Sequence, residues 1–430
     1  MFRLAAISYE GTEDGVSGWD LGPSDGYKMT AIDCLVAGDY TNPEDHTIEA
    51  LLFYIQAEWM CLQDATMDLS VVIGMVARLA MRMGIHRDSK VNSGLTAFRR
   101  EMRRRIWAQI CVFDSLYSFQ LSLPASIHQD ECDCDLPRNI WNRDFNEDTV
   151  TLPPPRPLTE NTEVCYNIIK TRLQLLFGRI MAVTESSDTL ITEIVIKYEQ
   201  ELDEIRKEIP PHFQVPLPGE ISMASSSLKE TQINLDRIYQ AARCVLYRKF
   251  LRRDFANVRY RGFCIDAAMI LLSHQAVLFL ECGSLFPQNT KQQHRTVFTT
   301  HDFFIACMAI ALDLHYGFET DFTSPSKQDI ALWGYDRRYD MTIALETSTE
   351  FWKASREDSI EAAKAYGIFS FAVSKAKKAL GMAGADPKKN PVIPETAINY
   401  EPVPLDAPLD ASLGMKEADG WPTDVDWASP

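Results

Sequence analysis

The stretch AFRREMRRRIWAQICVFDSLYSFQL, residues 97–121, decides the fold class of the chain. Its first turns are basic, and its later turns carry large apolar side chains at intervals of three and four residues. These side chains are Ile106, Trp107, Ile110, Phe113 and Tyr117. Apolar residues at this spacing line one face of an α-helix, and Pro124 marks its end. The segment therefore predicts a long amphipathic helix that buries its apolar half.

The same spacing recurs along most of the chain. It predicts helices at 27–36, 47–61, 69–83, 164–180, 188–209, 229–253, 263–281 and 301–316, with two more between 344 and 379. Gly84 stands where a helix C-cap belongs. No stretch combines strand-like alternation with turn residues, and no strand precedes a glycine-rich loop, which disfavours an α/β enzyme. The sequence thus predicts an all-α, multi-helix fold.

Composition divides the chain into three parts. Residues 1–26 are rich in Gly, Asp and Ser without a period, which predicts an irregular N-terminal segment. Residues 27–380 hold the predicted helices and are expected to form one all-helical domain, which includes a Pro-rich linker at 151–157. Residues 381–430 are expected to be a disordered tail.

The end of that tail, residues 400–430, is acidic and hydrophobic. It has seven acidic side chains and one basic one, interleaved with Leu405, Leu409, Leu413, Trp421 and Trp427. Bulky apolar side chains kept exposed by like charge are typical of disordered segments that bind coactivators. A solvated terminus without a role is the alternative, because termini are commonly disordered.

The net charge of the whole chain argues against nucleic-acid binding unless positive charge is segregated. The 430 residues include 43 basic and 60 acidic side chains, for a net charge of −17, with 46% hydrophobic and 24% charged residues. A field of this sign repels phosphate backbones. The composition itself is that of an ordinary globular protein, which excludes collagen, coiled coil and whole-chain disorder.

The cysteine pattern and the N-terminus indicate an intracellular protein. The ten cysteines are scattered, mostly in apolar stretches, and no Cys-x2-Cys pair occurs, so we expect reduced thiols rather than disulfides or a zinc ribbon. The N-terminal apolar run is too short for a signal peptide. The most apolar long stretch, 263–280, includes Asp266 and His274, so we expect no membrane span there.

One cluster has metal-capable side chains close together in sequence. His128, Cys132 and Cys134 lie beside Asp130, Asp133 and Asp135. Zinc sites pair such ligands with a distant second pair, which the chain lacks, so a loop with capping aspartates is favoured over a metal site. Asp130-Glu131 also lacks the later aspartate of a magnesium-binding acidic motif. We therefore expect no metal and no cofactor in this chain.

No catalytic signature occurs either. The chain has no Gly-x-Ser-x-Gly elbow, and its eight histidines show no paired spacing. We therefore assign no catalytic residues and predict that the chain is not an enzyme. The sequence identifies no DNA-binding residues and leaves ligand-binding residues unknown.

The densest basic run is Phe98-Arg-Arg-Glu-Met-Arg-Arg-Arg-Ile-Trp107. Arginines on this helix can contact phosphates or form a nuclear import signal. They can also pack beneath the core and pair with acids such as Asp114 or Asp133. The structural interpretation is favoured, because no groove-reading motif accompanies the run.

Several segments in order resemble the fungal-specific transcription factor domain, the regulatory region of fungal binuclear zinc-cluster transcription factors. The segments are Tyr40-Thr-Asn-Pro with Thr47-Ile-Glu-Ala-Leu-Leu52, Ala77-Arg-Leu-Ala with Gly84-Ile-His-Arg-Asp88, Glu101-Met-Arg-Arg-Arg-Ile-Trp107 with Asp114, Pro124 and Asp133-x-Asp-Leu-Pro137, Leu246-Tyr-Arg-Lys-Phe-Leu251, Cys264-Ile-Asp-Ala-Ala268, and Phe303-Phe-Ile-Ala306. The resemblance covers roughly residues 27–380. Two departures are Ser122-Leu-Pro124, where the family usually has Gly-Arg-Pro, and Ala108, where it has a second tryptophan.

The resemblance implies a nuclear regulator of RNA polymerase II transcription of metabolic or biosynthetic genes. In the family, DNA is read by a six-cysteine motif that holds two zinc ions, and no part of this sequence supplies that motif. DNA contact is therefore expected only through a zinc-cluster domain missing from this chain or through a partner factor, with homodimers as a further expectation. The alternative is an all-helical small-molecule-binding protein or enzyme unrelated to transcription.

Overall fold

The computed structural model describes residues 3–4, 24–62, 64–88, 94–186, 192–215, 226–251, 258–285, 300–320 and 337–382. Most of the predicted N-terminal segment and nearly all of the predicted tail, including residues 400–430, lie outside these ranges. The described residues form helices and connecting turns, without strands, so the predicted all-α fold class is confirmed. The proposed domain boundaries stay predictions.

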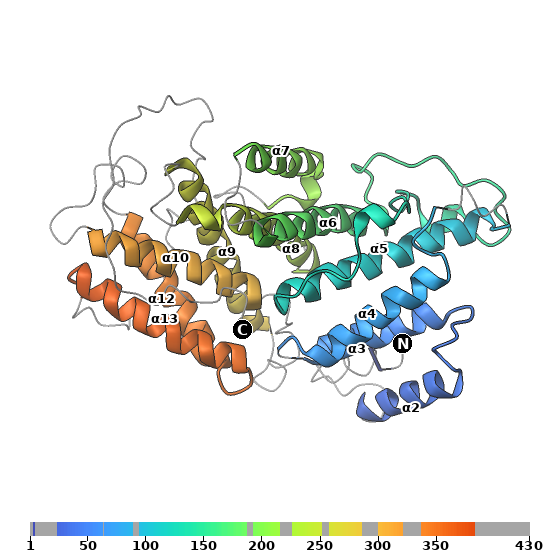
Figure 1. Cartoon of the computed structure of the whole chain (residues 1–430), viewed down its shortest axis with the longest axis horizontal. Helices are drawn as coiled ribbons and strands as arrows, with labels where there is room; N and C mark the ends of the chain where they lie inside the picture. The colour runs from blue at the N-terminus through green and yellow to red at the C-terminus, as the bar shows by residue number, and fades with distance from the viewer. Residues whose placement is uncertain are drawn as a thin grey trace.

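Helices account for most of the described chain, and they follow one another in the order predicted. The N-terminal group is α2 (Ser24–Ala37), α3 (Thr47–Cys61), α4 (Met67–Arg82) and α5 (Ala97–Gln120). The second group is α6 (Cys165–Ser186), α7 (Thr192–Glu208), α8 (Ser226–Tyr247), α9 (Val258–Leu285), α10 (Thr300–Thr320), α12 (Arg337–Ser355) and α13 (Ile360–Ala379). Figure 1 shows the first group at one end of the elongated molecule and α9 to α13 at the other.

The predicted boundaries are mostly close, and the largest differences occur where a helix has no apolar signal. α12 begins at Arg337, seven residues before the predicted start, because its first turn is polar and arginine-rich. The predicted helix 229–253 ends at Tyr247 and continues as a 3-10 turn at Arg248–Leu251. α6 extends to Ser186, beyond the predicted end at 180.

Three helices end in the same C-terminal hydrogen-bond pattern. In α4, Gly84 has φ +70° and donates to the Met81 carbonyl, while Ile85 donates to that of Ala80. α13 ends likewise at Gly381, with φ +67°. In α5 the left-handed position is occupied by Ser122, with φ +52°, a conformation that favours glycine. The C-cap prediction for Gly84 is confirmed.

The N-terminal core is a cluster of buried apolar side chains from α3, α4 and α5. Trp59 of α3 lies edge-on to Phe113 of α5, with ring centroids 5.1 Å apart. Ile73 of α4 packs into the same cluster. Trp107, Ile110, Phe113 and Tyr117 of the predicted apolar spacing are buried, and Ile106 is half-buried. Every residue from Ile110 to Gln120 is buried, so the second half of α5 is covered on all sides and not only along one stripe.

The C-terminal core is larger and includes side chains from α6 to α10, α12 and α13. α8 and α9 contribute many of its buried side chains, such as Leu246 and Ala268, although α8 also has charged residues. Phe119, near the end of α5, also belongs to this core, with its ring centroid 4.7 Å from that of Phe177 in α6. α5 therefore contributes side chains to both cores.

A second contact joins the two groups of helices far apart in sequence. The carboxylate of Asp64, in the turn between α3 and α4, accepts hydrogen bonds from the Ser359 hydroxyl (2.5 Å) and from the Ile360 backbone N–H (2.8 Å). Ser359 is itself the N-cap of α13 and accepts a bond from the Ala362 N–H. A carboxylate at a helix N-terminus satisfies free N–H groups and complements the helix dipole.

One helix segment in the described part of the chain is long and apolar enough to cross a membrane. It is Arg259–Phe279 within α9, with a mean hydropathy of 1.6. In the structure 67% of this segment is buried against other helices. The core helix of a folded domain can have the same length and composition.

Candidate functional site

The basic half of α5 borders a long connection, residues 121–164, that leads to α6. Thr96 begins the helix by accepting a hydrogen bond from the Arg99 N–H. Arg104 then turns toward the protein, where its guanidinium donates to Asp88 (2.7 Å) and Asp135 (3.1 Å). Asp88 is almost completely buried, so this arginine holds together two segments on either side of α5.

Arg105 makes a second inward contact. It donates to Glu101, one turn earlier (3.1 Å), and to the side-chain oxygen of Asn142 (2.7 Å), and its guanidinium lies 5.1 Å from the centroid of the Phe145 ring. The Glu101 side chain is fully buried and also accepts a bond from the Arg138 N–H. Burial raises the pKa of Glu101, although both hydrogen bonds favour its ionised form.

These contacts confirm the structural interpretation for Arg104 and Arg105 but correct the predicted partners. Asp114 does not meet the arginines; its carboxylate accepts from the backbone N–H groups of Ser126 and Ile127. Asp133 accepts from the backbone N–H of Asp88. The reason for the first error is helical rise, which places Asp114 about 15 Å along the axis from Arg104.

The two arginines at the start of α5 face solvent. Arg99 forms an exposed ion pair with Asp45, at 2.9 Å, and Arg100 is also exposed. The helix therefore has an inner pair of arginines that organise the connection and an outer pair on the surface. The outer pair is too small a patch to counter the negative charge of the chain.

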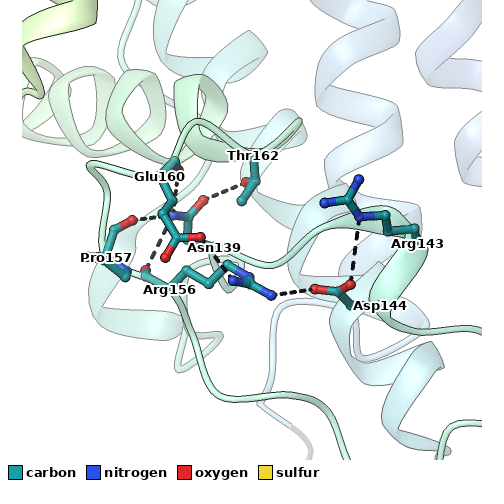
Figure 2. A network of polar contacts seen from close by, with 7 residues as sticks. All are labelled: Asn139, Arg143, Asp144, Arg156, Pro157, Glu160 and Thr162. Atoms are coloured by element: carbon teal, nitrogen blue, oxygen red, sulfur yellow. Dashed lines mark hydrogen bonds and ion pairs between the residues drawn. The ribbon is translucent and has the colours of Figure 1, made fainter.

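Asn139 organises the connection between α5 and α6, as Figure 2 shows. Its amide nitrogen donates to three backbone carbonyls, those of Arg156, Pro157 and Glu160, at 2.8 to 3.3 Å. Its amide oxygen accepts from the Thr162 hydroxyl at 2.5 Å. Because both ends of the amide are used, this buried side chain replaces the backbone pairing that a loop lacks.

The rim of the same network is ionic. Arg156 donates to Glu160 (2.9 Å) and to Asp144 (3.1 Å), and Asp144 is also 4.0 Å from Arg143 (Figure 2). The Pro-rich segment 151–157 is thus fixed to the domain at its end. Sequence reasoning treated it only as a linker and missed Asn139, whose role depends on contacts with residues 17 to 23 positions later.

The metal-capable cluster is not brought together around a common point. His128 is exposed, the Cys132 thiol donates to the His128 carbonyl (3.4 Å), and Asp135 binds Arg104. Burial raises the pKa of Cys132, and it raises that of Cys134 to about 12. Within the described residues, no group of three or more metal-capable side chains could hold an ion. Both cysteines instead pack against the N-terminal core.

The C-terminal core contains three ion pairs that sequence reasoning missed. Arg237 of α8 binds Asp302 of α10, and both side chains are almost completely buried. The other two pairs are Arg337 with Asp266, at 2.8 Å, and Arg261 with Asp313. Each pair joins two helices. The available signal was a charged residue on an otherwise apolar helix face, which a single sequence does not pair with its partner.

A polar cluster between α6 and α8 surrounds one of these arginines. The side chain of Asn234 contacts the Tyr166 hydroxyl and accepts a bond from Arg237 (2.7 Å). Lys170 lies 6.0 Å from the Tyr166 ring centroid. Burial lowers the pKa of Lys170 to about 8, and the positive charge of Arg237 adds to this effect. Burial alone lowers the pKa of Arg237, to about 10.

A buried histidine and aspartate form a further pair between α8 and α9. His274 lies 2.7 Å from the carboxylate of Asp236. Burial opposes ionisation of Asp236, yet the hydrogen bond and charge of His274 hold the pKa of this carboxyl below its ordinary value. The geometry orients the two helices. Gln240 also donates to the Asp236 carboxylate, at 3.2 Å, so this carboxylate is held by side chains of both helices.

Comparison with known families decides between the remaining interpretations. Residues 37–207, from the end of α2 through α7, match the model of the fungal specific transcription factor domain. This part of the chain is a fungal specific transcription factor domain. The domain thus includes α5, its arginines and the Asn139 network. The resemblance drawn from the ordered sequence segments is confirmed.

Relatives extend the similarity beyond that domain. The Zn(2)-C6 fungal-type transcription factor mpsB of Macrophomina phaseolina is 34% identical over 357 residues, which cover 82% of this chain and 48% of that protein. The factor pigI of Monascus ruber is 30% identical over 82% of this chain and 43% of its own length. The equisetin cluster transcription factor eqxF of Fusarium heterosporum is 29% identical, over 79% and 48%.

The chain spans about half the length of these curated relatives. No solved structure shows significant similarity to the chain. The arrangement of α5, the connection to α6 and the buried ion pairs is therefore described from this structure alone.

Proposed function

We propose that this chain is the regulatory part of a fungal transcription factor that controls RNA polymerase II transcription of metabolic or biosynthetic genes in the nucleus. The observation that carries the proposal is the family domain at residues 37–207. Similarity to proteins named as transcription factors extends beyond this domain, over 82% of the chain. One of those relatives is named for the equisetin cluster, which supports a biosynthetic gene set as the target class.

The geometry supports a regulatory role rather than direct reading of DNA by α5. Arg104 and Arg105 are occupied by protein acceptors, and the exposed Arg99 pairs with Asp45. DNA contact in this proposal comes from a zinc-cluster domain or from a partner factor. A homodimer is a further part of the proposal, since family members bind DNA as dimers or monomers.

The alternative, an all-helical binding protein or enzyme unrelated to transcription, has less support. The family and the relatives are transcription factors, and the buried titratable groups pair with helix-joining partners. In this proposal the chain is therefore not an enzyme.

Gene deletion in the fungus that carries the gene, followed by transcript sequencing, tests the proposal. A contiguous set of biosynthetic genes should change together, and reintroduction of the intact gene should restore them. Unchanged transcripts under conditions where the gene is expressed would contradict the proposal. The same strains, with the protein tagged, show whether it enters the nucleus.

Two properties of the purified chain follow from the proposal. It should carry no stoichiometric zinc, and alone it should bind DNA only weakly and with strong salt dependence, because its net charge is −17. Elemental analysis and a binding titration at physiological salt measure both. One or two tightly held zinc ions, or a nanomolar sequence-selective complex with DNA, would contradict the proposal that this chain alone neither binds zinc nor reads DNA.

The acidic tail is proposed to bind a coactivator. Fused to a heterologous DNA-binding domain, residues 400–430 should activate a reporter gene. Replacing Leu405, Leu409, Trp421 and Trp427 by alanine should abolish activation while the acids remain, since the apolar side chains make the contact. Activation that survives the four substitutions would contradict the proposed contact and favour the alternative of a solvated terminus without a role.

A further inference from the structure

The outer face of α13 has exposed apolar side chains from Ile360 to Phe371, in the first part of the helix. Ile360 is 72% exposed, Ile368 46% and Phe371 66%. Ala363 and Gly367 lie on the same face, and nothing approaches within 4 Å of where a Cβ on Gly367 would stand. These side chains form an apolar stripe together with Lys364, which is exposed on the same face four residues after Ile360 and four before Ile368. An exposed apolar cluster beside charged side chains is a candidate interaction surface.

A groove borders this stripe toward α12. It has a volume of about 600 Å³ and is lined on the α13 side by Ser374, Lys377 and Lys378, and on the α12 side by Glu346 and Glu350 among others. Lys377 pairs with Glu346 across it. Tyr366 and Val373 also line the groove, so an occupant would meet apolar as well as charged side chains there.

The charge of α13 is opposite to that of the protein as a whole. The helix has four lysines and one acid, for a net charge of +3, whereas the chain carries −17. Lys364, Lys375 and Lys378 are exposed beside the apolar stripe. A partner that fits both features is acidic and carries bulky apolar side chains.

We propose that residues 400–430 of the same chain bind to the outer face of α13 and its groove. Seven acids and five Leu or Trp side chains give this tail the chemistry that the surface requires. The tail begins 21 residues after Ala379, and such a connection spans up to about 70 Å when extended, against a helix length of about 30 Å. Attachment to the same chain raises its effective concentration at the surface.

Charge argues against a second copy of the chain as the occupant. Two α13 faces brought together would place the lysines of one beside the lysines of the other, which is unfavourable. The binding proposed here is a property of the isolated chain and does not depend on its role in transcription. A tail held on α13 has fewer of its apolar side chains available to other proteins.

Zero-length carbodiimide cross-linking of the full chain tests the proposal, because the reagent joins an amine to a carboxylate only at ion-pair distance. The expected products link Lys364, Lys375 or Lys378 to acids of residues 400–430. The pair Lys377 with Glu346 serves as an internal control, since its cross-link reports reagent activity and an intact α12–α13 contact. Mixing ¹⁵N-labelled and unlabelled chains distinguishes links within one chain from links between copies.

A matched set of substitutions gives the test its contrast. Ile368→Glu with Phe371→Glu should lower the tail cross-links about tenfold, because the apolar contact is lost and like charge is introduced. Val71→Glu on α4 is the control, since Val71 is 63% exposed on another surface, and it should leave the yield unchanged. Trp421→Ala with Trp427→Ala keeps every tail carboxylate and should also lower the yield.

Each other outcome contradicts the proposal. Absent tail links while Lys377 and Glu346 are joined would show that the tail does not occupy α13. Tail links that persist in the Ile368→Glu/Phe371→Glu variant would show that the tail is attracted by charge alone and makes no specific apolar contact with α13. Tail links of which about half join a labelled to an unlabelled chain in an equal mixture would identify a second copy as the occupant. If that α13 variant also loses the internal control link, the variant with Trp421→Ala and Trp427→Ala provides the test, and an unchanged yield of tail links in it would contradict the proposal.

Discussion

The two ends of the molecule use arginine in different ways. Around α5, Arg104 and Arg105 lie at the edge of the N-terminal core, where they tie loops and turns to the helix. In the C-terminal core, Arg237 is buried between helices and faces Asp302. The first arrangement organises chain segments that lack regular structure, and the second fixes how packed helices are oriented. The same residue type thus contributes differently according to its access to water.

The difference has an energetic basis. A guanidinium open to water, such as that of Arg99, keeps its hydration, so its pair with a carboxylate changes stability little. The side chains of Arg104 and Arg105 are 13% and 18% exposed, which places them between this limit and full burial. A buried guanidinium has lost its hydration and depends on its partner for compensation. Variants that remove one partner should therefore separate the two regions clearly, and we order the predictions from the largest effect to the smallest.

Removing Asp302 tests the buried end of the comparison. Asp302→Ala leaves Arg237 without its carboxylate inside the C-terminal core, and we expect the free energy of unfolding to fall by about 3–5 kcal/mol. Chemical denaturation measures it. Replacing both residues at once, Arg237→Met with Asp302→Leu, should recover most of the loss, because no uncompensated charge remains. If Asp302→Ala alone is as stable as the natural chain, Asp302 does not compensate the buried charge of Arg237.

Asn139→Ala tests the neutral hub beside α5. The change removes four hydrogen bonds from a buried site, although the carbonyls of Pro157 and Glu160 and the Thr162 hydroxyl each keep one bond from a backbone N–H, so we expect a cost of about 1–3 kcal/mol. Hydrogen exchange across residues 139–162 should rise in the variant. Arg156→Ala, at the exposed rim of the same network, is the control and should change stability by less than about 1 kcal/mol.

Ser122 and Gly84 form a reciprocal pair of tests at the ends of α5 and α4. Ser122→Gly should stabilise the protein by about 1 kcal/mol, because glycine adopts a positive φ without steric cost. Gly84→Ser places a side chain in the same conformation and should destabilise by a similar amount. Thermal unfolding measures the stability change of each variant, and we expect the two changes to have opposite signs. Changes of the same sign would show that the two helix ends are not equivalent.

Arg99→Ala tests the solvent-exposed end of the comparison and should have the smallest effect. The pair with Asp45 is open to water on both sides, so we expect a change below about 0.5 kcal/mol. Stability measured at low and high salt completes the test. A loss comparable to that of Asp302→Ala would mean that exposure does not govern how these arginines contribute.

The sequence predicted the helices well because their periodicity is local. The apolar residues from Trp107 to Tyr117 on α5, for example, are buried as expected. It predicted polar partners poorly. Asp114 was expected to meet the arginines but binds the backbone of Ser126 and Ile127, because partner choice depends on how the connection folds back. Asn139 gave no signal at all, since one amide among loop residues does not reveal the carbonyls that surround it.

The two cores share α5, and this has a consequence for how the protein unfolds. Because Phe113 packs in one core and Phe119 in the other, melting this helix exposes apolar surface in both. The bond from Asp64 to the start of α13 adds a second link. Heating should therefore give a single cooperative transition, with calorimetric and van't Hoff enthalpies that agree. Cutting the gene near residue 160 should not yield two halves that fold independently.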